Sequence, residues 1–281
     1  MATDQKRVHY YHADATALGG HIKTPFDQAI PVVAPLSLPP VGGYAVARAE
    51  QYRLEGILSF ESAHTQVAGS ISHKNGAWTT LATSVVEGLN ILDVIVVDRI
   101  VAQIATEHPA IGYNPKITFI GTQFENVRIA GYPVQIILNL NLCAQAEGKD
   151  GFPQTSLFED DRFLAASAEQ YKAMSIEKNI PEWVKDRTIP AWVKERYTWD
   201  NEQLKKRSAV LCSLVTQVKG EFPGRPFGNV LEIPEIGKIF LGELLVDHNT
   251  FRLIAIRAEL GCATSGATAA GVVAVEGSTW P

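Results

Sequence analysis

The sequence is poor in the residue patterns that usually reveal an enzyme. It has no G-x-S-x-G nucleophile turn, no P-loop and no G-x-G-x-x-G turn, so the commonest hydrolase and nucleotide-binding classes have no support. It also lacks an H-E-x-x-H motif and closely paired cysteines, which removes the usual zinc sites. We therefore expect no metal and no cofactor, and the sequence nominates no catalytic residue.

Cysteine itself is scarce. The 281 residues include only Cys143, Cys212 and Cys262, and an odd number does not make a disulfide framework. A chain of this length buries enough apolar surface without cross-links, so we expect three reduced, buried thiols. One disulfide with one free thiol is the alternative.

Long apolar runs and an excess of positive charge are missing too. The most apolar stretch, 91–104, is interrupted by Asp93, Asp98 and Arg99, so no membrane span is expected. The first residues lack the apolar segment of a secretory signal, which favours the cytoplasm, or secretion and the envelope if a signal has been removed. The formal net charge of -5 offers no basic surface for nucleic acid.

What the sequence does contain is an internal repeat. Glu55-Gly56-Ile57, Glu87-Gly88-Leu89 and Glu125-Asn126-Val127 lie in similar apolar segments, and residues 86–96 match 124–134 over a longer run. Repeats of this size predict strand–turn–strand units that assemble by pairing. The three glutamates form either a carboxylate row that binds a ligand or, as we favour, the same turn contact in each unit.

Strand signals cover most of the chain. Asn75-Gly76 predicts a hairpin with a type I′ turn, because both residue types accept positive φ. The β-branched run at 89–105 predicts two strands, the second near 99–106, and the alternating run at 134–142 predicts another.

The N-terminal part has the same character. Residues 8–13 are rich in strand formers, and Gly19-Gly20 predicts a turn after them. Four prolines lie within 30–41, and proline cannot donate to a sheet ladder. We therefore expect 30–41 at a sheet edge.

The composition changes near residue 156. Between 158 and 207 lie ten acidic and ten basic residues, together with three of the five tryptophans. Ser156 and Glu159 match a capping box, and the residues after them show a helical apolar face. The predicted fold is thus mainly β: an antiparallel, sandwich-like or solenoid-like body (1–155 and 208–281) with a charged helical insertion (156–207).

The insertion contains a tandem pattern. Ile180–Arg187 and Ile189–Arg196 share the order Ile-Pro-x-Trp-Val-Lys-acid-Arg, and Pro190 would break one continuous helix. Two short helical turns, each with a tryptophan, are expected. Tryptophan beside lysine and arginine is typical of interface hot spots. The interface candidates are Trp183, Trp192, Lys185, Arg187, Lys194 and Arg196. The alternative, which we favour for the rings, is that both fasten the insertion to the β body.

The histidines and acids of the chain do not suggest a metal site. His9 and His12 would point to opposite faces of a strand, whereas His12 and Asp14 would share one face. Glu159-Asp160-Asp161 suits the positive end of a helix dipole.

Several short motifs resemble those of the bacterial choice-of-anchor β-proteins. They are Ala13–Gly20, Ala34–Pro40, Gly88–Leu92 with Asp98, and Gly131–Val134. The resemblance implies a β body that is secreted and tethered to the envelope. It implies no activity and no catalytic residue. The charged insertion, the missing signal and the missing C-terminal anchor depart from that pattern.

A large β body without a catalytic pattern favours a non-enzymatic binding or self-assembling structural protein. We expect a homo-oligomer or a protein partner, with Trp183 or Trp192 at or near the contact. The alternative is an enzyme or small-molecule carrier whose site lies between the β body and the insertion. A deep pocket with convergent polar groups would favour the alternative, and an exposed, symmetric edge would favour the first interpretation.

Overall fold

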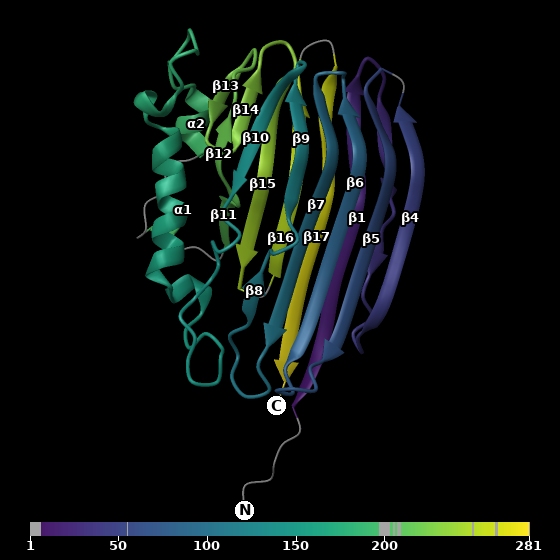
Figure 1. Cartoon of the computed structure of the whole chain (residues 1–281), viewed down its shortest axis with the longest axis vertical. Helices are drawn as coiled ribbons and strands as arrows, with labels where there is room; N and C mark the ends of the chain where they lie inside the picture. Colours follow the sequence, from purple (N-terminus) through teal and green to yellow (C-terminus); the bar gives the residue numbers. More distant parts are fainter. Residues whose placement is uncertain are drawn as a thin grey trace, which may run out of the picture.

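The strands of this chain form two antiparallel sheets that pack face to face, with a helical segment along one side (Figure 1). The computed structural model describes residues 7–54, 56–196, 203–204, 206, 209–248, 250–261 and 264–280, and only the backbone of Arg196 and Trp280. The mainly β fold predicted from the sequence is confirmed, and the body is sandwich-like rather than solenoid-like.

The first sheet has nine strands. They are β1 (Val8–Thr24), β2 (Gln28–Val33), β3 (Leu36–Ser37), β11 (Ala209–Ser213), β13 (Arg225–Phe227), β14 (Val230–Ile233), β15 (Gly237–Asp247), β16 (Thr250–Leu260) and β17 (Ser265–Trp280). Their order is β13-β14-β15-β16-β17-β1-β2, with β11 on β15 and β3 on β1. Because β1 pairs with β17, the first and last strands of the chain lie side by side inside this sheet.

The second sheet has eight strands. They are β4 (Gly43–Leu54), β5 (Leu58–Ile71), β6 (Trp78–Ile91), β7 (Ile95–His108), β8 (Lys116–Thr118), β9 (Gln123–Ile129), β10 (Tyr132–Leu138) and β12 (Val215–Lys219). Their order is β12-β10-β9-β7-β6-β5-β4, with β8 on β7. Most neighbours are consecutive in the chain, as expected for a body of hairpins.

Residue alternation explains how the sheets pack. In β1, Tyr11, Ala13, Ala15 and Ala17 are buried, whereas the residues between them are more exposed. The inward alanines leave room for larger residues of the facing sheet. A hydrogen bond also crosses between the sheets, from Ser84 Oγ on β6 to the carbonyl oxygen of Thr16 at 3.0 Å.

The predicted repeat is present as two hairpins. Residues 86–96 contain the turn between β6 and β7, and 124–134 contain the turn between β9 and β10. Leu92 and Asp93 have φ of 55° each, and the equivalent Ala130 and Gly131 have 50° and 83°. Both tight turns therefore match the strand twist in the way a type I′ turn does.

The hairpin at Asn75-Gly76 is confirmed, but its type I′ turn is wrong. The connection from β5 to β6 spans residues 72–77, and only Gly76 has positive φ, at 68°. Ser72 closes the loop, because its N–H donates to Ala77 O (2.7 Å) and its carbonyl accepts from Gly76 N (2.9 Å). Asn75 uses its side chain instead, accepting from Ala77 N at 3.2 Å.

Other predicted boundaries also need correction. The β-branched run is two strands, but β7 begins at Ile95 rather than near 99, and β10 ends at Leu138 rather than 142. The turn predicted at Gly19-Gly20 is wrong, since both residues lie inside β1. A Cβ on Gly20 would lie 2.4 Å from Ala267 O, so glycine permits close approach of β17 there.

The proline-rich segment takes the predicted place. β2 ends the nine-stranded sheet and β3 continues along β1, so 30–41 follows a sheet edge. Pro31 lies in β2 and removes one donor from that edge.

The insertion begins with the predicted capping box. Ser156 N donates to Glu159 Oε2 at 3.3 Å ahead of η1 (Leu157–Glu159), and Asp160 caps α1 (Asp161–Met174) by accepting from the Arg162 and Phe163 amides. η2 (Glu177–Asn179) and α2 (Ala191–Arg196) follow. The buried face of α1 joins the same hydrophobic cluster as the sheets. Within the described ranges, no helix has the length and apolarity needed to cross a bilayer.

The tandem pattern forms two helical turns, as predicted, and only the second extends into a helix. Both units start alike, because Val184 N donates to Pro181 O and Val193 N to Pro190 O, each at 3.1 Å. Only the second unit continues as a helix, α2. The first unit ends after one turn. Asp186 then accepts hydrogen bonds from the backbone N and the Oγ1 of Thr188.

Candidate functional site

A groove separates the first tandem unit from the edge of the nine-stranded sheet. We call it the Trp183 groove. It has a volume of about 1050 Å³. Its walls come from the segment 183–186, the loop before β13, and the ends of β14, β15 and β16. The side chains that line it include those of Trp183, Lys185, Asp186, Phe222, Arg225, Glu232 and Lys238.

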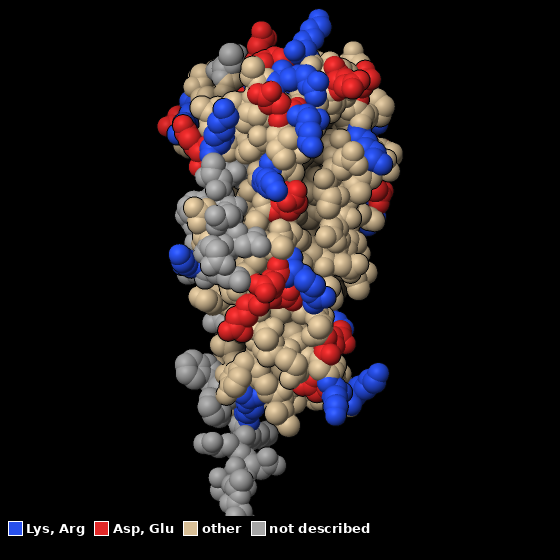
Figure 2. Space-filling view, turned by 90° about the vertical axis from the view of Figure 1, so that its left-hand side faces the viewer, with Lys and Arg blue, Asp and Glu red and all other residues tan. Residues whose placement is uncertain are grey.

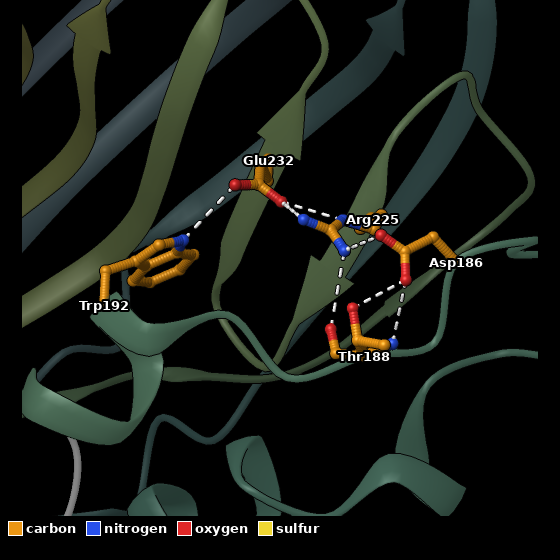
Figure 3. Close-up of polar contacts among 5 residues, drawn as sticks. All are labelled: Asp186, Thr188, Trp192, Arg225 and Glu232. Carbon is orange, nitrogen blue, oxygen red and sulfur yellow. Dashed lines mark hydrogen bonds and ion pairs between the residues drawn. The ribbon is translucent and has the colours of Figure 1, made fainter.

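Arg225 is the centre of the polar contacts in this groove (Figure 3). Strand pairing places it opposite Glu232, where its Nε donates to Glu232 Oε2 at 2.8 Å and its Nη2 donates to the same oxygen. Its Nη1 donates to Asp186 Oδ2 at 2.6 Å and to Thr188 O at 3.4 Å. One guanidinium thus joins the β13–β14 hairpin to the insertion through charge-assisted hydrogen bonds to two carboxylates.

The carboxylate of Asp186 is held in its ionised form. Thr188 donates to Asp186 Oδ1 from Oγ1 at 2.7 Å and from its backbone N at 3.1 Å. These hydrogen bonds, the side-chain bond foremost, and the nearby Arg225 charge lower the pKa of Asp186 below its ordinary value. A general acid at neutral pH needs a raised pKa, so Asp186 is a poor proton donor.

The two tandem tryptophans pack on the body from neighbouring positions. The ring of Trp183 meets Phe222 edge-on, with centroids 5.3 Å apart, and that of Trp192 meets Phe227 at 5.7 Å. Trp192 Nε1 also donates to Glu232 Oε1 at 3.2 Å (Figure 3). Both side chains are half-buried, so each fastens the insertion while keeping part of its surface open.

The structure separates the six predicted interface residues. Trp183 and Lys185 line the groove. Trp192 is not part of the lining and instead donates a hydrogen bond to Glu232. Arg187 turns back into the insertion, where its Nη2 donates to Ile180 O at 2.9 Å. Lys194 is exposed on α2, and the side chain of Arg196 lies outside the described part of the chain.

Sequence reasoning missed Asp186, Arg225 and Glu232 as site residues. Arg225 and Glu232 flank a turn at Gly228, and a short hairpin places such residues opposite each other as a cross-strand ion pair. That local signal could have found the pair, but nothing in the sequence shows that Asp186 would meet it.

The charged residues of this side of the molecule are mixed in sign. Figure 2 shows acidic and basic side chains interspersed on the face that carries the insertion. The groove repeats this pattern, with Asp186 and Glu232 both paired to Arg225. It therefore offers no strong field of one sign to a ligand.

His9 and His12 lie on opposite faces of β1, as predicted. His12 contacts Asp14 and Glu276, each at 3.1 Å, which confirms that His12 and Asp14 share a face. His9 is instead buried, with its ring 4.7 Å from that of His108. Burial lowers the pKa of His9 to about 4, and burial followed by the charge of His9 lowers that of His108 to about 3. Within the described residues no metal-binding group of His, Cys, Asp or Glu occurs.

Two of the three repeated glutamates are not turn contacts. Glu87 and Glu125 lie in β6 and β9 on either side of Arg99, at 3.6 and 3.1 Å, so the predicted turn role is wrong for both. Glu55 lies outside the described residues. Cys143 and Cys212 are free and buried, as predicted, and burial raises both thiol pKa values. Cys262 falls outside the described residues.

Comparison with known proteins identifies the family of this chain. A search of curated proteins and a search of solved structures each find no match. The family model that does match covers residues 9–247, from β1 through the insertion to the end of β15. That span is most of the chain. The chain therefore belongs to DUF8256, a family described as a domain of unknown function.

Proposed function

We propose that this chain is a non-enzymatic binding protein whose ligand lies in the Trp183 groove. The observation that carries the proposal is an open groove with one half-buried aromatic wall and polar groups already fixed in place. Its volume is about 1050 Å³, just above the roughly 300–1,000 Å³ of small-ligand sites. An extended ligand suits this space better than a compact one.

The charges of the groove favour an uncharged ligand. Arg225 is neutralised by Asp186 and Glu232, so a charged ligand gains little from it. Asp186 Oδ2 and Glu232 Oε1 each accept one hydrogen bond, from Arg225 and Trp192, so the second lone pair of each oxygen can accept another. The groove therefore presents fixed acceptors to a ligand rich in hydroxyl groups.

An oligosaccharide has this chemistry. Its hydroxyl groups would donate to Asp186 and Glu232, and the apolar face of a sugar ring would pack on Trp183. Acceptors that are already oriented cost little conformational entropy on binding, which favours affinity from few contacts.

Binding can be measured by isothermal titration with neutral oligosaccharides, such as cellohexaose, maltohexaose and chitohexaose. We expect one of these classes to bind, and Trp183→Ala to weaken it about tenfold, which corresponds to roughly 1.4 kcal/mol. Tyr132→Ala is the matched control, because Tyr132 is 54% exposed on β10 and does not line the groove. Unchanged affinity in Trp183→Ala, or no binding of any class, would contradict the proposal.

An enzyme remains the second candidate, since Asp186 and Glu232 contact one guanidinium, and glycoside hydrolysis uses two nearby carboxyl groups. The lowered pKa of Asp186 argues against it as the acid of such a pair. Assay of the same mixtures for new reducing ends separates the candidates. Their appearance with the wild type, and their loss in Asp186→Asn, would favour the enzyme.

Self-assembly and an envelope location remain predictions. The half-buried tryptophans contact their own subunit, so the exposed strand β4 supports assembly better than they do. Cell fractionation of the source organism would test the location implied by the choice-of-anchor resemblance.

A further inference from the structure

The four ends of the two sheets differ greatly in length. β13, β12 and β2 have three, five and six residues, and β2 carries Pro31. β4 has twelve residues and is the outermost strand of its sheet, at the right of Figure 1. Short length and proline are two of the devices that protect an edge from pairing, and β4 has neither.

The side chains of β4 suit a second strand. Ala45, Ala47 and Ala49 pack toward the core, whereas Tyr44 (66% exposed) and Val46 (41% exposed) lie on the outer face. Arg48 and Glu50 share that outer face and are exposed. β4 pairs with β5 in one register, and from Gly43 to Glu50 its other edge offers a regular ladder, which ends at Gln51, whose φ is 36°.

Arg48 and Glu50 differ from the charged residues at the centre of this sheet, which form ion pairs. Arg99 is flanked by Glu87 and Glu125, and Asp98 contacts Arg128 at 2.7 Å. Neither Arg48 nor Glu50 has an ion pair within the described residues. The two charges, of opposite sign, are thus left at the open edge.

We propose that β4 pairs antiparallel with β4 of a second copy, about a two-fold axis at Ala49. This register places Arg48 opposite Glu50 of the partner subunit, and two-fold symmetry makes the contact twice. An axis at Arg48 would oppose two arginines, and an axis at Ala47 would oppose each charge with an apolar residue. Charge complementarity therefore selects Ala49, and the two eight-stranded sheets become continuous.

Charge exchange tests both the contact and its register. The wild type should be a dimer by light scattering with size-exclusion chromatography. Arg48→Glu opposes Glu to Glu, and Glu50→Arg opposes Arg to Arg, so each should weaken dimerisation at least tenfold. The double variant restores opposite charges and should return to within about twofold of the wild type.

Lys172→Glu is the matched control, because this exposed lysine lies on α1, far from β4 in Figure 1. It should dimerise as the wild type does. A wild type that stays monomeric at millimolar concentration overturns the proposal. So do single variants that dimerise normally, or a double variant that fails to recover. These substitutions leave the Trp183 groove intact, so the outcome is independent of saccharide binding.

Discussion

Arg225 Nη1 on β13 lies 2.6 Å from Asp186 Oδ2 in the insertion, and this ion pair joins the insertion to the β body. The same guanidinium is anchored by Glu232 on the neighbouring strand. The pair therefore fixes the position of the first tandem unit, and with it the Trp183 wall of the groove.

Removing the guanidinium should destabilise the fold. Arg225→Met leaves the partly buried Glu232 without its main partner, and we expect a loss of about 2 kcal/mol in the free energy of unfolding. Urea denaturation measures it. Arg162→Met is the control: Arg162 is 67% exposed, and its contact with Asp160 is long, so we expect less than about 0.5 kcal/mol. Equal losses in both variants would show that Arg225 has no special role.

The buried histidines make stability depend on pH. The folded pKa values of His9 and His108 are about 4 and about 3, below the unfolded value of 6.5. Between these folded values and pH 6.5 the unfolded chain therefore binds more protons than the folded chain. The free energy of unfolding should therefore be unaffected by these groups above pH 6.5 and fall as the pH decreases toward 3. His108→Phe should flatten this fall by about 2 kcal/mol.

His73→Gln is the control for that measurement, because His73 is exposed in the loop between β5 and β6. Thermal unfolding followed from pH 7 to pH 4 compares the variants. A fall that His108→Phe leaves unchanged would mean that burial of His108 does not contribute to it.

Close packing of β1 against β17 makes Gly20 sensitive to substitution. Gly20→Ala would force a Cβ to within 2.4 Å of Ala267 O, so one strand must shift, at a cost of about 2 kcal/mol. Gly261→Ala is matched, since no atom lies within 4 Å of its added Cβ, and should be nearly neutral. Chemical denaturation gives the free energy of unfolding of both variants. A loss in Gly20→Ala alone assigns the effect to the close approach of the strands, and equal losses assign it to the loss of glycine flexibility.

The Gly76 turn can be tested by changing only its tolerance of positive φ. Gly76→Val should lose about 1–2 kcal/mol, because a β-branched residue resists a φ of 68°. Gly76→Asn should lose much less, since asparagine accepts this conformation. Comparable losses in the two variants would assign the effect to the added side chain rather than to φ.

Local patterns in the sequence predicted most of the strands and not their partners. The alternation in 134–142 and the β-branched run at 89–105 report burial on a sheet, which is a local property. The turn predicted at Gly19-Gly20 was wrong, because the sequence does not distinguish a glycine in a turn from one that allows a distant strand to approach closely. The positions of the tight turns at Leu92-Asp93 and Ala130-Gly131 could not be predicted from the repeat, because leucine and alanine rarely adopt positive φ.

The site was less predictable than the fold for the same reason. The tandem pattern identified Trp183 and Lys185, which line the groove. Asp186, Arg225 and Glu232 meet only because the insertion folds back on β13, and no spacing in the sequence encodes that contact. The position of β4 as an edge strand likewise depends on the order of the strands in the folded sheet.

The central claim, that the Trp183 groove binds a neutral oligosaccharide, is tested most directly by fluorine NMR of protein labelled with 5-fluorotryptophan. The Trp183 resonance, assigned with Trp183→Phe, should shift on addition of the saccharide that binds, while that of the buried Trp78 stays unchanged. A Trp183 resonance that does not move with any oligosaccharide of the panel would contradict the account.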